Sequence, residues 1–192
     1  GEMSYPEYRK NIKEFLYKSV EYRLISDVPV GVFLSGGVDS SLVTAMAKKI
    51  IPGDLKTFTI GFEDSKFNEA TYAKEIANYI GTNHYEKILS RNDIISVIDK
   101  LPRMYDEPFG DSSAIPTFLV SKLAAENGVK VVLSADGGDE FFFGYSKYTR
   151  YLQLIKYYKL FSKIFKNSKF DFFGRIFKIN DTKIKKLNYL FN

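Results

Sequence analysis

Two glycine pairs with acidic neighbours are the residues in this sequence best suited to chemistry. The segment 35–37 (Ser-Gly-Gly) is followed by Asp39 and Ser40, and the segment 136–138 (Asp-Gly-Gly) is followed by Asp139. Glycine lets the backbone take positive φ values and lets an anion approach the N–H groups closely. A helix that begins near Asp39 or Ser40 adds N–H donors and the positive end of its dipole, and both favour a phosphate group.

Asp39 needs a separate explanation, because a carboxylate beside a phosphate is repulsive unless a cation lies between them. We therefore expect Mg2+ at Asp39, and Asp139 could bind the same ion. Simpler interpretations exist: a glycine pair is often only a tight turn, and an aspartate at a helix start is often only a cap. Because two such turns occur, the sequence favours a site for a metal-bound polyphosphate.

Two common phosphate-binding motifs do not fit the first turn. Gly31 and Gly36 have the glycine spacing of a Walker-type loop, but Gly37 stands where that loop needs its lysine, and no lysine follows until Lys48. The GxGxxG motif of dinucleotide-binding domains is absent. A phosphate site here would therefore be of another type.

The segments that must position these turns alternate between two kinds of apolar pattern. Short apolar runs predict buried strands, and apolar residues three or four apart predict helices. The expected strands are 30–34, 55–62, 84–89 and 129–134, and the expected helices are 7–25, 41–50, 68–81, 92–101 and 117–127, with more helix from about 147. Asn92 is the expected N-cap of the fourth helix.

This alternation predicts an α/β fold with an open, mainly parallel sheet and helices on both faces. We expect five strands in that sheet, one more than the four runs named above. Ligands of such sheets lie beyond the carboxyl ends of the strands. Both glycine turns are expected at those ends. His84, the only histidine, is expected to have a structural or surface role.

Composition and charge set the outer bounds. The 192 residues include no cysteine, which excludes disulfides and a cysteine nucleophile. We find neither a signal-peptide core at the start nor an apolar run that could span a bilayer, so a cytoplasmic location is expected. We expect a main domain over 1–150 and a basic, aromatic, helical tail over 151–192. The tail carries a net charge of +8, and the first 150 residues carry −3.

The basic tail leaves two interpretations open. Its charge and aromatic residues are compatible with contact to RNA or a membrane. The favoured interpretation is that they pack against a further C-terminal region, because the aromatic residues form no regular stripe. We therefore expect neither a nucleic-acid nor a membrane partner.

Three ordered motifs carry a family resemblance: RLISDVPVGVFLSGGVDSSLV (23–43), DEPFGDSSAIPT (106–117) and LSADGGDEFFFGY (133–145). SGGVDSS resembles the SGGxDS pyrophosphate loop of the N-type ATP pyrophosphatases. Together the motifs resemble the synthetase domain of the glutamine-dependent asparagine synthetases and their β-lactam synthetase relatives, over about residues 10–150. The resemblance implies an adenine nucleotide alpha-hydrolase-like fold.

The resemblance also implies a reaction. ATP and Mg2+ would bind, a substrate carboxylate would attack the α-phosphorus, and pyrophosphate would leave an acyl-adenylate. Ammonia would then displace AMP to form an amide. The expected acceptor is the aspartate side chain, with ammonia supplied by a glutaminase domain that this chain lacks, and a homodimer is possible. Two alternatives stay open: a sugar acid or other carboxylate as acceptor, or a nucleotide-binding module without complete activity.

Site residues follow from the resemblance by motif. The expected ATP-binding residues are Phe33, Leu34, Ser35, Gly36, Gly37, Asp39, Ser40, Ile60, Ser134 and Ala135. Asp39 and Asp139 would bind Mg2+. Asp136 stands where many relatives have a glutamate and is the catalytic candidate, facing the amino-acid substrate or the attacking amine. Phe143 replaces a glycine of the usual DELFGGY continuation, so the loop there is expected to be reshaped.

Overall fold

The computed structural model describes residues 3–63, 68–107 and 110–164 of the chain. Contacts divide the chain into two units, Gly1–Asp139 and Glu140–Asn192, which are described separately. The first unit contains the sheet and both glycine turns.

Four strands form one parallel sheet in the described part of the chain: β1 (Val30–Phe33), β2 (Lys56–Phe62), β3 (Asn83–Leu89) and β4 (Val131–Leu133). Their order is β3-β2-β1-β4, so β1 is central and β4 lies at an edge. Val32 of β1 aligns with Thr57 on one side and with Leu133 on the other. The expectation of a parallel sheet is confirmed, but a fifth strand is not found among the described residues.

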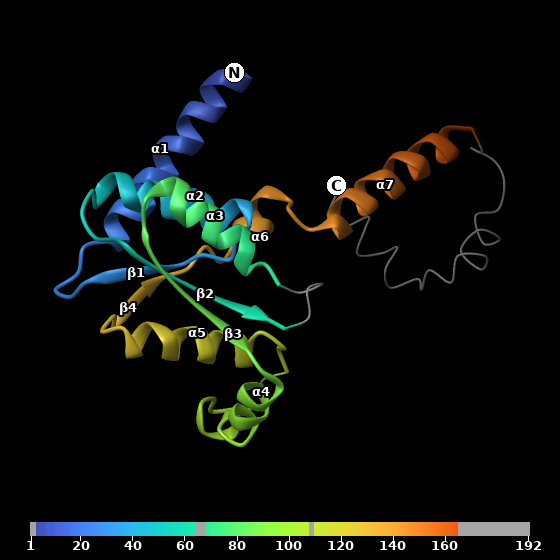
Figure 1. Cartoon of the computed structure of the whole chain (residues 1–192). Helices are drawn as coiled ribbons and strands as arrows, with labels where there is room; N and C mark the ends of the chain where they lie inside the picture. The colour runs from blue at the N-terminus through green and yellow to red at the C-terminus, as the bar shows by residue number, and fades with distance from the viewer. Residues whose placement is uncertain (1–2, 64–67, 108–109, 165–192) are drawn as a thin grey trace. The chain divides into compact units, whose positions relative to one another are not determined.

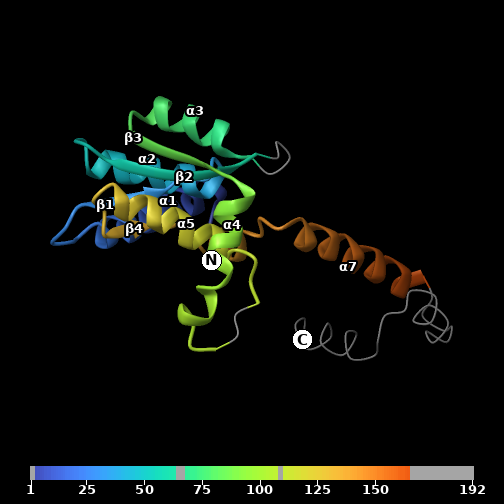
Figure 2. The ribbon, with the colours of Figure 1, turned by 60° about the horizontal axis from the view of Figure 1, so that its bottom comes forward.

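Helices cover both faces of the sheet, as the sequence predicts (Figure 1). The first group is α1 (Tyr5–Arg23), α2 (Val38–Ile50) and α3 (Ala70–Ile80); the second is α4 (Arg91–Ile98) and α5 (Ala114–Glu126), with a short 3-10 helix at Leu101–Arg103. Figure 2 shows α3 alongside β3 and the second group on the other face.

Alternating side chains of the strands fill a core on each face. Val32 of β1 packs with Val20 of α1 and Met46 of α2 on the first face. On the second face, Phe58 of β2 is fully buried against α5, and its ring stacks on that of Tyr85 with the centroids 5.4 Å apart. Helices therefore cover both faces of the sheet, which explains why the central strand β1 is apolar along its whole length.

Local signals at the helix ends account for the small differences from the predicted boundaries. Gly81 ends α3 with φ of 78°, as expected. Asn92 does not cap α4, so that prediction is wrong. The cap is Ser90, whose hydroxyl accepts from the N–H of Asp93, while the Asp93 carboxylate accepts from the N–H of Ser90. This reciprocal pair is a capping box.

The remaining described elements are α6 (Gly138–Phe142) and α7 (Ser146–Ile164). α7 confirms the helix expected from about residue 147, and the rest of the tail lies outside the described residues. Phe143 follows α6 with φ of 58°, a left-handed conformation that suits glycine better than phenylalanine. Among the described residues, no helix has the length and hydropathy needed to span a membrane.

Candidate functional site

The first glycine turn needs glycine at position 36 for two reasons. Gly36 has φ of 85°, and a Cβ placed on it would lie 2.9 Å from the backbone nitrogen of Ala73 in α3. Gly37 is the N-cap of α2, and as a glycine it has no side chain that could bond the first N–H groups of the helix. The turn thus presents backbone donors where a helix begins, and such donors attract an anion.

Hydroxyl groups hold this turn in shape. Ser40 is buried, and its Oγ accepts from the N–H of Ser35 at 3.2 Å and lies 2.9 Å from Ser35 Oγ. Ser40 and Ser41 both donate to the carbonyl of Gly37, at 3.2 and 2.6 Å. Ser40 therefore holds the turn in shape. Ser35 and Gly37 are exposed, and the N–H of Gly37 donates to Ser35 Oγ at 3.3 Å.

The second glycine turn lies against the first. β4 pairs with β1, so the segments that follow these two strands leave the sheet side by side. Gly137 has φ of 92°, and Gly138 packs so closely on Asp39 that an added Cβ would overlap Oδ2 and lie 2.5 Å from Cγ. The structure therefore brings together the two turns that the sequence singled out, with the Asp39 carboxylate at their junction.

The residues expected around adenine lie on three neighbouring strands or directly after them. Phe33 ends β1, and Leu34 follows it with its side chain buried against α3. Ser134 and Ala135 come directly after β4. Ile60 lies within β2, two residues before its end, and packs in the core of the α5 face. The side chains of Leu34 and Ile60 thus pack in the core, and the N–H of Leu34 donates to the carbonyl of Phe58.

The acidic residues suit a magnesium ion shared with phosphates. Asp136 is exposed beyond β4, and Asp39 and Asp139 are half-buried. No group of three or more His, Asp or Glu side chains that could hold a metal occurs in the described segments. Mg2+ commonly takes one or two protein carboxylates and completes its octahedron with water and substrate phosphates. Asp39, with Asp139 in the segment that contacts it, fits that donor set.

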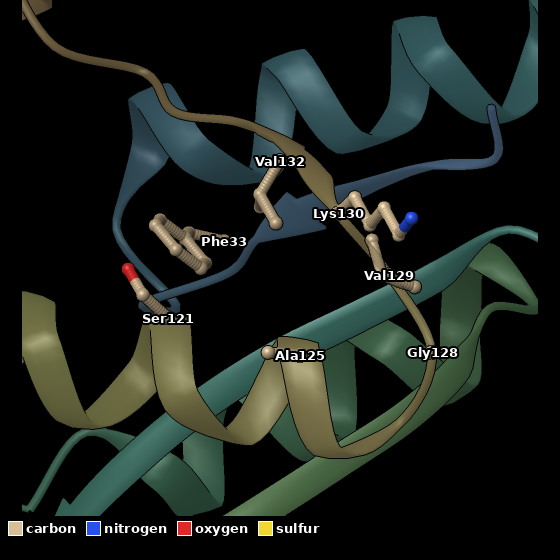
Figure 3. A pocket seen from close by; sticks show the side chains of 7 residues that line it. All are labelled: Phe33, Ser121, Ala125, Gly128, Val129, Lys130 and Val132. Atoms are coloured by element: carbon tan, nitrogen blue, oxygen red, sulfur yellow. The ribbon is translucent and has the colours of Figure 1, made fainter. Parts of the chain in front are cut away.

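A pocket of about 570 Å³ lies between α5 and the edge strand β4 (Figure 3). Its walls include Phe33, Ser121, Lys130 and Val132. Of the predicted nucleotide residues only Phe33 reaches it, and the other walls belong to α5, its C-terminal turn and β4. This pocket is therefore distinct from the junction of the two turns.

His84 lies away from that junction. It belongs to the amino-terminal end of β3, and its Nδ1 is 2.9 Å from the hydroxyl of Thr57. Its Nε2 is buried without a hydrogen-bond partner in the described part of the molecule, and burial lowers the pKa of the imidazole. These contacts fit the structural role expected for His84.

Sequence reasoning missed Thr59. This buried β2 residue donates from Oγ1 to the carbonyl of Leu34, directly before the first turn. The visible signal was a pair of threonines, Thr57 and Thr59, at alternate positions of a strand predicted to be buried. Nothing in the sequence distinguished the two.

The fold and the paired turns define an α/β domain with two glycine turns side by side at the carboxyl ends of its parallel strands. The chain matches the asparagine synthase family over residues 11–180 and belongs to that family. A Methanocaldococcus jannaschii protein is 48% identical over 134 residues, which cover 69% of this chain and 26% of that protein. Asparagine synthetase (glutamine-hydrolyzing) 1 of Bacillus subtilis is 41% identical over 145 residues, which cover 76% of this chain and 23% of that enzyme.

The chain spans about a quarter of the length of these curated relatives. Among solved structures, it resembles an NH3-dependent NAD synthetase from Campylobacter jejuni, with 19% identity and a TM-score of 0.48 over 71% of this chain and 60% of that one. An NMN synthetase from Francisella tularensis gives 16% identity and a TM-score of 0.48 over 75% and 59% of the two chains.

Proposed function

We propose that this domain binds ATP with Mg2+ and activates a carboxylate as an acyl-adenylate, which ammonia then converts to an amide. The observation that carries the proposal is the contact between the two turns, where Gly138 packs directly on the carboxylate of Asp39. It places an acidic group among exposed backbone donors, an arrangement that suits a phosphate group only when a cation accompanies it. Family membership supports the same chemistry.

Each part of the site has a role in this proposal. The N–H groups of the first turn and the start of α2, together with the exposed hydroxyl of Ser35, bind the oxygens of the departing pyrophosphate. Asp39 and Asp139 hold the magnesium ion, which neutralises phosphate charge. Backbone groups near Phe33 and Ile60 frame the adenine on one side, and Ser134 and Ala135 meet the nucleotide from the other.

Asp136 is assigned to the acceptor side of the reaction. It is exposed and follows the end of β4, next to the strand that leads into the first turn. There its carboxylate can bind the ammonium group of an amino acid or orient the attacking amine. We propose aspartate as the acceptor, with asparagine as the product and ammonia delivered by a glutaminase domain of the whole protein.

Calorimetric titration of the chain with ATP, with and without Mg2+, tests nucleotide binding. The Asp39→Asn variant keeps the shape of the side chain and removes its charge, so Mg2+-dependent affinity should fall at least about tenfold, or about 1.4 kcal/mol. Asp54→Asn is the matched control, because Asp54 is an exposed aspartate before the amino end of β2, at the opposite edge of the sheet.

The two variants must differ for the proposal to hold. Equal affinities of the Asp39→Asn variant and the parent chain, with the fold retained by circular dichroism, would exclude the magnesium role of Asp39. Isotope exchange between pyrophosphate and ATP then tests the acceptor. Exchange that requires aspartate supports the proposal, and exchange that requires a sugar acid instead replaces aspartate with that acceptor.

A further inference from the structure

The peptide that joins Leu34 to Ser35 is held by hydroxyl groups at both of its ends. Its carbonyl, from Leu34, accepts a hydrogen bond from Oγ1 of Thr59 in β2. Its N–H, from Ser35, donates to Oγ of Ser40 at 3.2 Å. This peptide is the last one before Gly36 and Gly37, so it sets the direction in which the chain enters the first turn.

The Thr59 hydroxyl acts where the ladder between β1 and β2 comes to an end. β1 ends at Phe33, and the N–H of Leu34 still donates to the carbonyl of Phe58 at 3.0 Å. A continued parallel ladder would direct the Leu34 carbonyl to a backbone N–H of β2. Here the side chain of Thr59 in β2 donates to the Leu34 carbonyl instead. β1 can therefore turn away from the sheet without leaving a buried acceptor unpaired.

Burial makes this hydrogen bond difficult to replace. Leu34 is 1% exposed and Thr59 is 4% exposed. A carbonyl buried to this degree must keep a hydrogen-bond partner or change position. Because a peptide group is planar and rigid, a change at the Leu34 carbonyl also rotates the Ser35 N–H at its other end.

We propose that Thr59 is a positioning residue of the nucleotide site. Its hydroxyl fixes the plane of the Leu34–Ser35 peptide, and that plane sets how the first turn presents its N–H groups to the bound phosphates. Within the turn, the N–H of Gly37 donates to Ser35 Oγ at 3.3 Å, so the orientation of Ser35 also bears on this N–H. Thr59 itself does not touch the nucleotide. The consequence for ATP affinity rests on the proposed function, whereas the effect on the turn does not.

Three variants separate positioning from general stability. Thr59→Val keeps the shape of the side chain and removes the hydroxyl, and Thr59→Ser restores a hydroxyl. Thr57→Val is the matched control: Thr57 is 0% exposed, lies on the same face of β2 two residues earlier, and bonds the hydroxyl of Thr82 and Nδ1 of His84, each at 2.9 Å. Thr57→Val also removes a buried hydroxyl from β2, but the hydrogen bonds that it loses go to side chains and do not involve the first turn.

Two measurements on each variant test the proposal. The first is calorimetric titration with ATP and Mg2+; the second is the amide chemical shifts and hydrogen exchange of Gly36 and Gly37 by NMR. We expect Thr59→Val to weaken ATP binding about tenfold (about 1.4 kcal/mol) and to shift both glycine amides. Thr59→Ser should recover most of the affinity. Thr57→Val should lower the melting temperature but leave the affinity and the two amides as in the parent chain.

The outcomes keep this inference apart from the proposed function. Parent affinity and unshifted glycine amides in Thr59→Val would overturn it, as would an equal loss of affinity in Thr57→Val. Should the parent chain bind no ATP, the proposed function fails, and the amides alone decide: shifts confined to the Thr59 variants support the positioning role, and unchanged amides refute it. Should Thr59→Val not fold, Thr59→Ser and Thr59→Ala are compared instead, and equal amide shifts and affinities in both exclude a role for the hydroxyl.

Discussion

The contact between Gly138 and Asp39 predicts a strong effect from adding one methyl group. In a Gly138→Ala variant, the new Cβ would overlap Oδ2 of Asp39 and lie 2.5 Å from its Cγ and 3.1 Å from its Cβ. Ordinary contacts of this kind are about 3.5–4.0 Å. The carboxylate must therefore move by about 1 Å. Gly138 is not among the glycines with positive φ, so alanine itself is tolerated by the backbone.

The expected result is a loss of function without a loss of fold. A displacement of about 1 Å in a group that positions a reacting ligand can cost about a hundredfold. We expect Mg2+-dependent ATP affinity to fall tenfold to a hundredfold, about 1.4–2.8 kcal/mol. The free energy of unfolding should change by less than about 1 kcal/mol, because alanine is a better helix former than glycine and Gly138 begins α6. Calorimetric titration and urea unfolding measure the two quantities.

A control and a double variant make this prediction specific. Gly53→Ala adds the same methyl group where nothing lies within 4 Å, so it should leave ATP affinity unchanged. In an Asp39→Asn background, Gly138→Ala should have little further effect, because the charge that it displaces is already gone. Parent affinity in Gly138→Ala, or additive losses in the double variant, would refute the inference that Gly138 acts through the Asp39 carboxylate.

Two further predictions concern stability. Burial lowers the pKa of His84 from 6.5, so the unfolded chain binds more protons than the folded chain between the two pKa values, and the free energy of unfolding should fall as pH drops below about 6.5. Urea unfolding at several pH values should show a smaller loss of stability in His84→Gln than in the parent chain. An equal loss of stability would exclude His84 as its source. Ser90→Ala should lower the free energy of unfolding by about 1 kcal/mol, whereas Asn92→Ala should change it by less than about 0.5 kcal/mol; the reverse ranking by the same method would mean that Asn92 is the cap.

The elements of the fold could be predicted because apolar periodicity and turn residues act locally. The strand predicted over 55–62 is Lys56–Phe62, and the helix predicted over 68–81 is Ala70–Ile80. The apolar pattern of the second helix begins only at Ser41 and the turn signal near Asp39 or Ser40, whereas α2 begins at Val38, because the residues of its first turn do not continue the apolar pattern. Ser90 was missed as a cap because Ser90 and Asn92 are both good caps, and only the backbone conformation selects between them.

The two halves of the candidate site were predictable separately, but their contact was not. Glycine pairs after apolar runs identified both turns from local sequence. The meeting of Asp39 with Gly138 depends on β4 pairing with β1, although about 100 residues separate the two strands in the chain. Spacing within a motif carries no information on strand order. The position of the carboxylate against the second turn therefore required the three-dimensional structure.

Thr57 and Thr59 show the same limit within a single strand. Both are buried threonines on one face of β2, and in sequence they are equivalent β-branched residues. Their partners differ because β1 ends at Phe33. Thr57 lies beside a continuous part of the sheet and bonds to His84 of β3 and to Thr82, which precedes β3. Thr59 lies beside the point where β1 leaves the sheet, and it bonds to a backbone carbonyl. The end of a neighbouring strand, rather than the residue type, makes Thr59 a candidate for control of the phosphate turn.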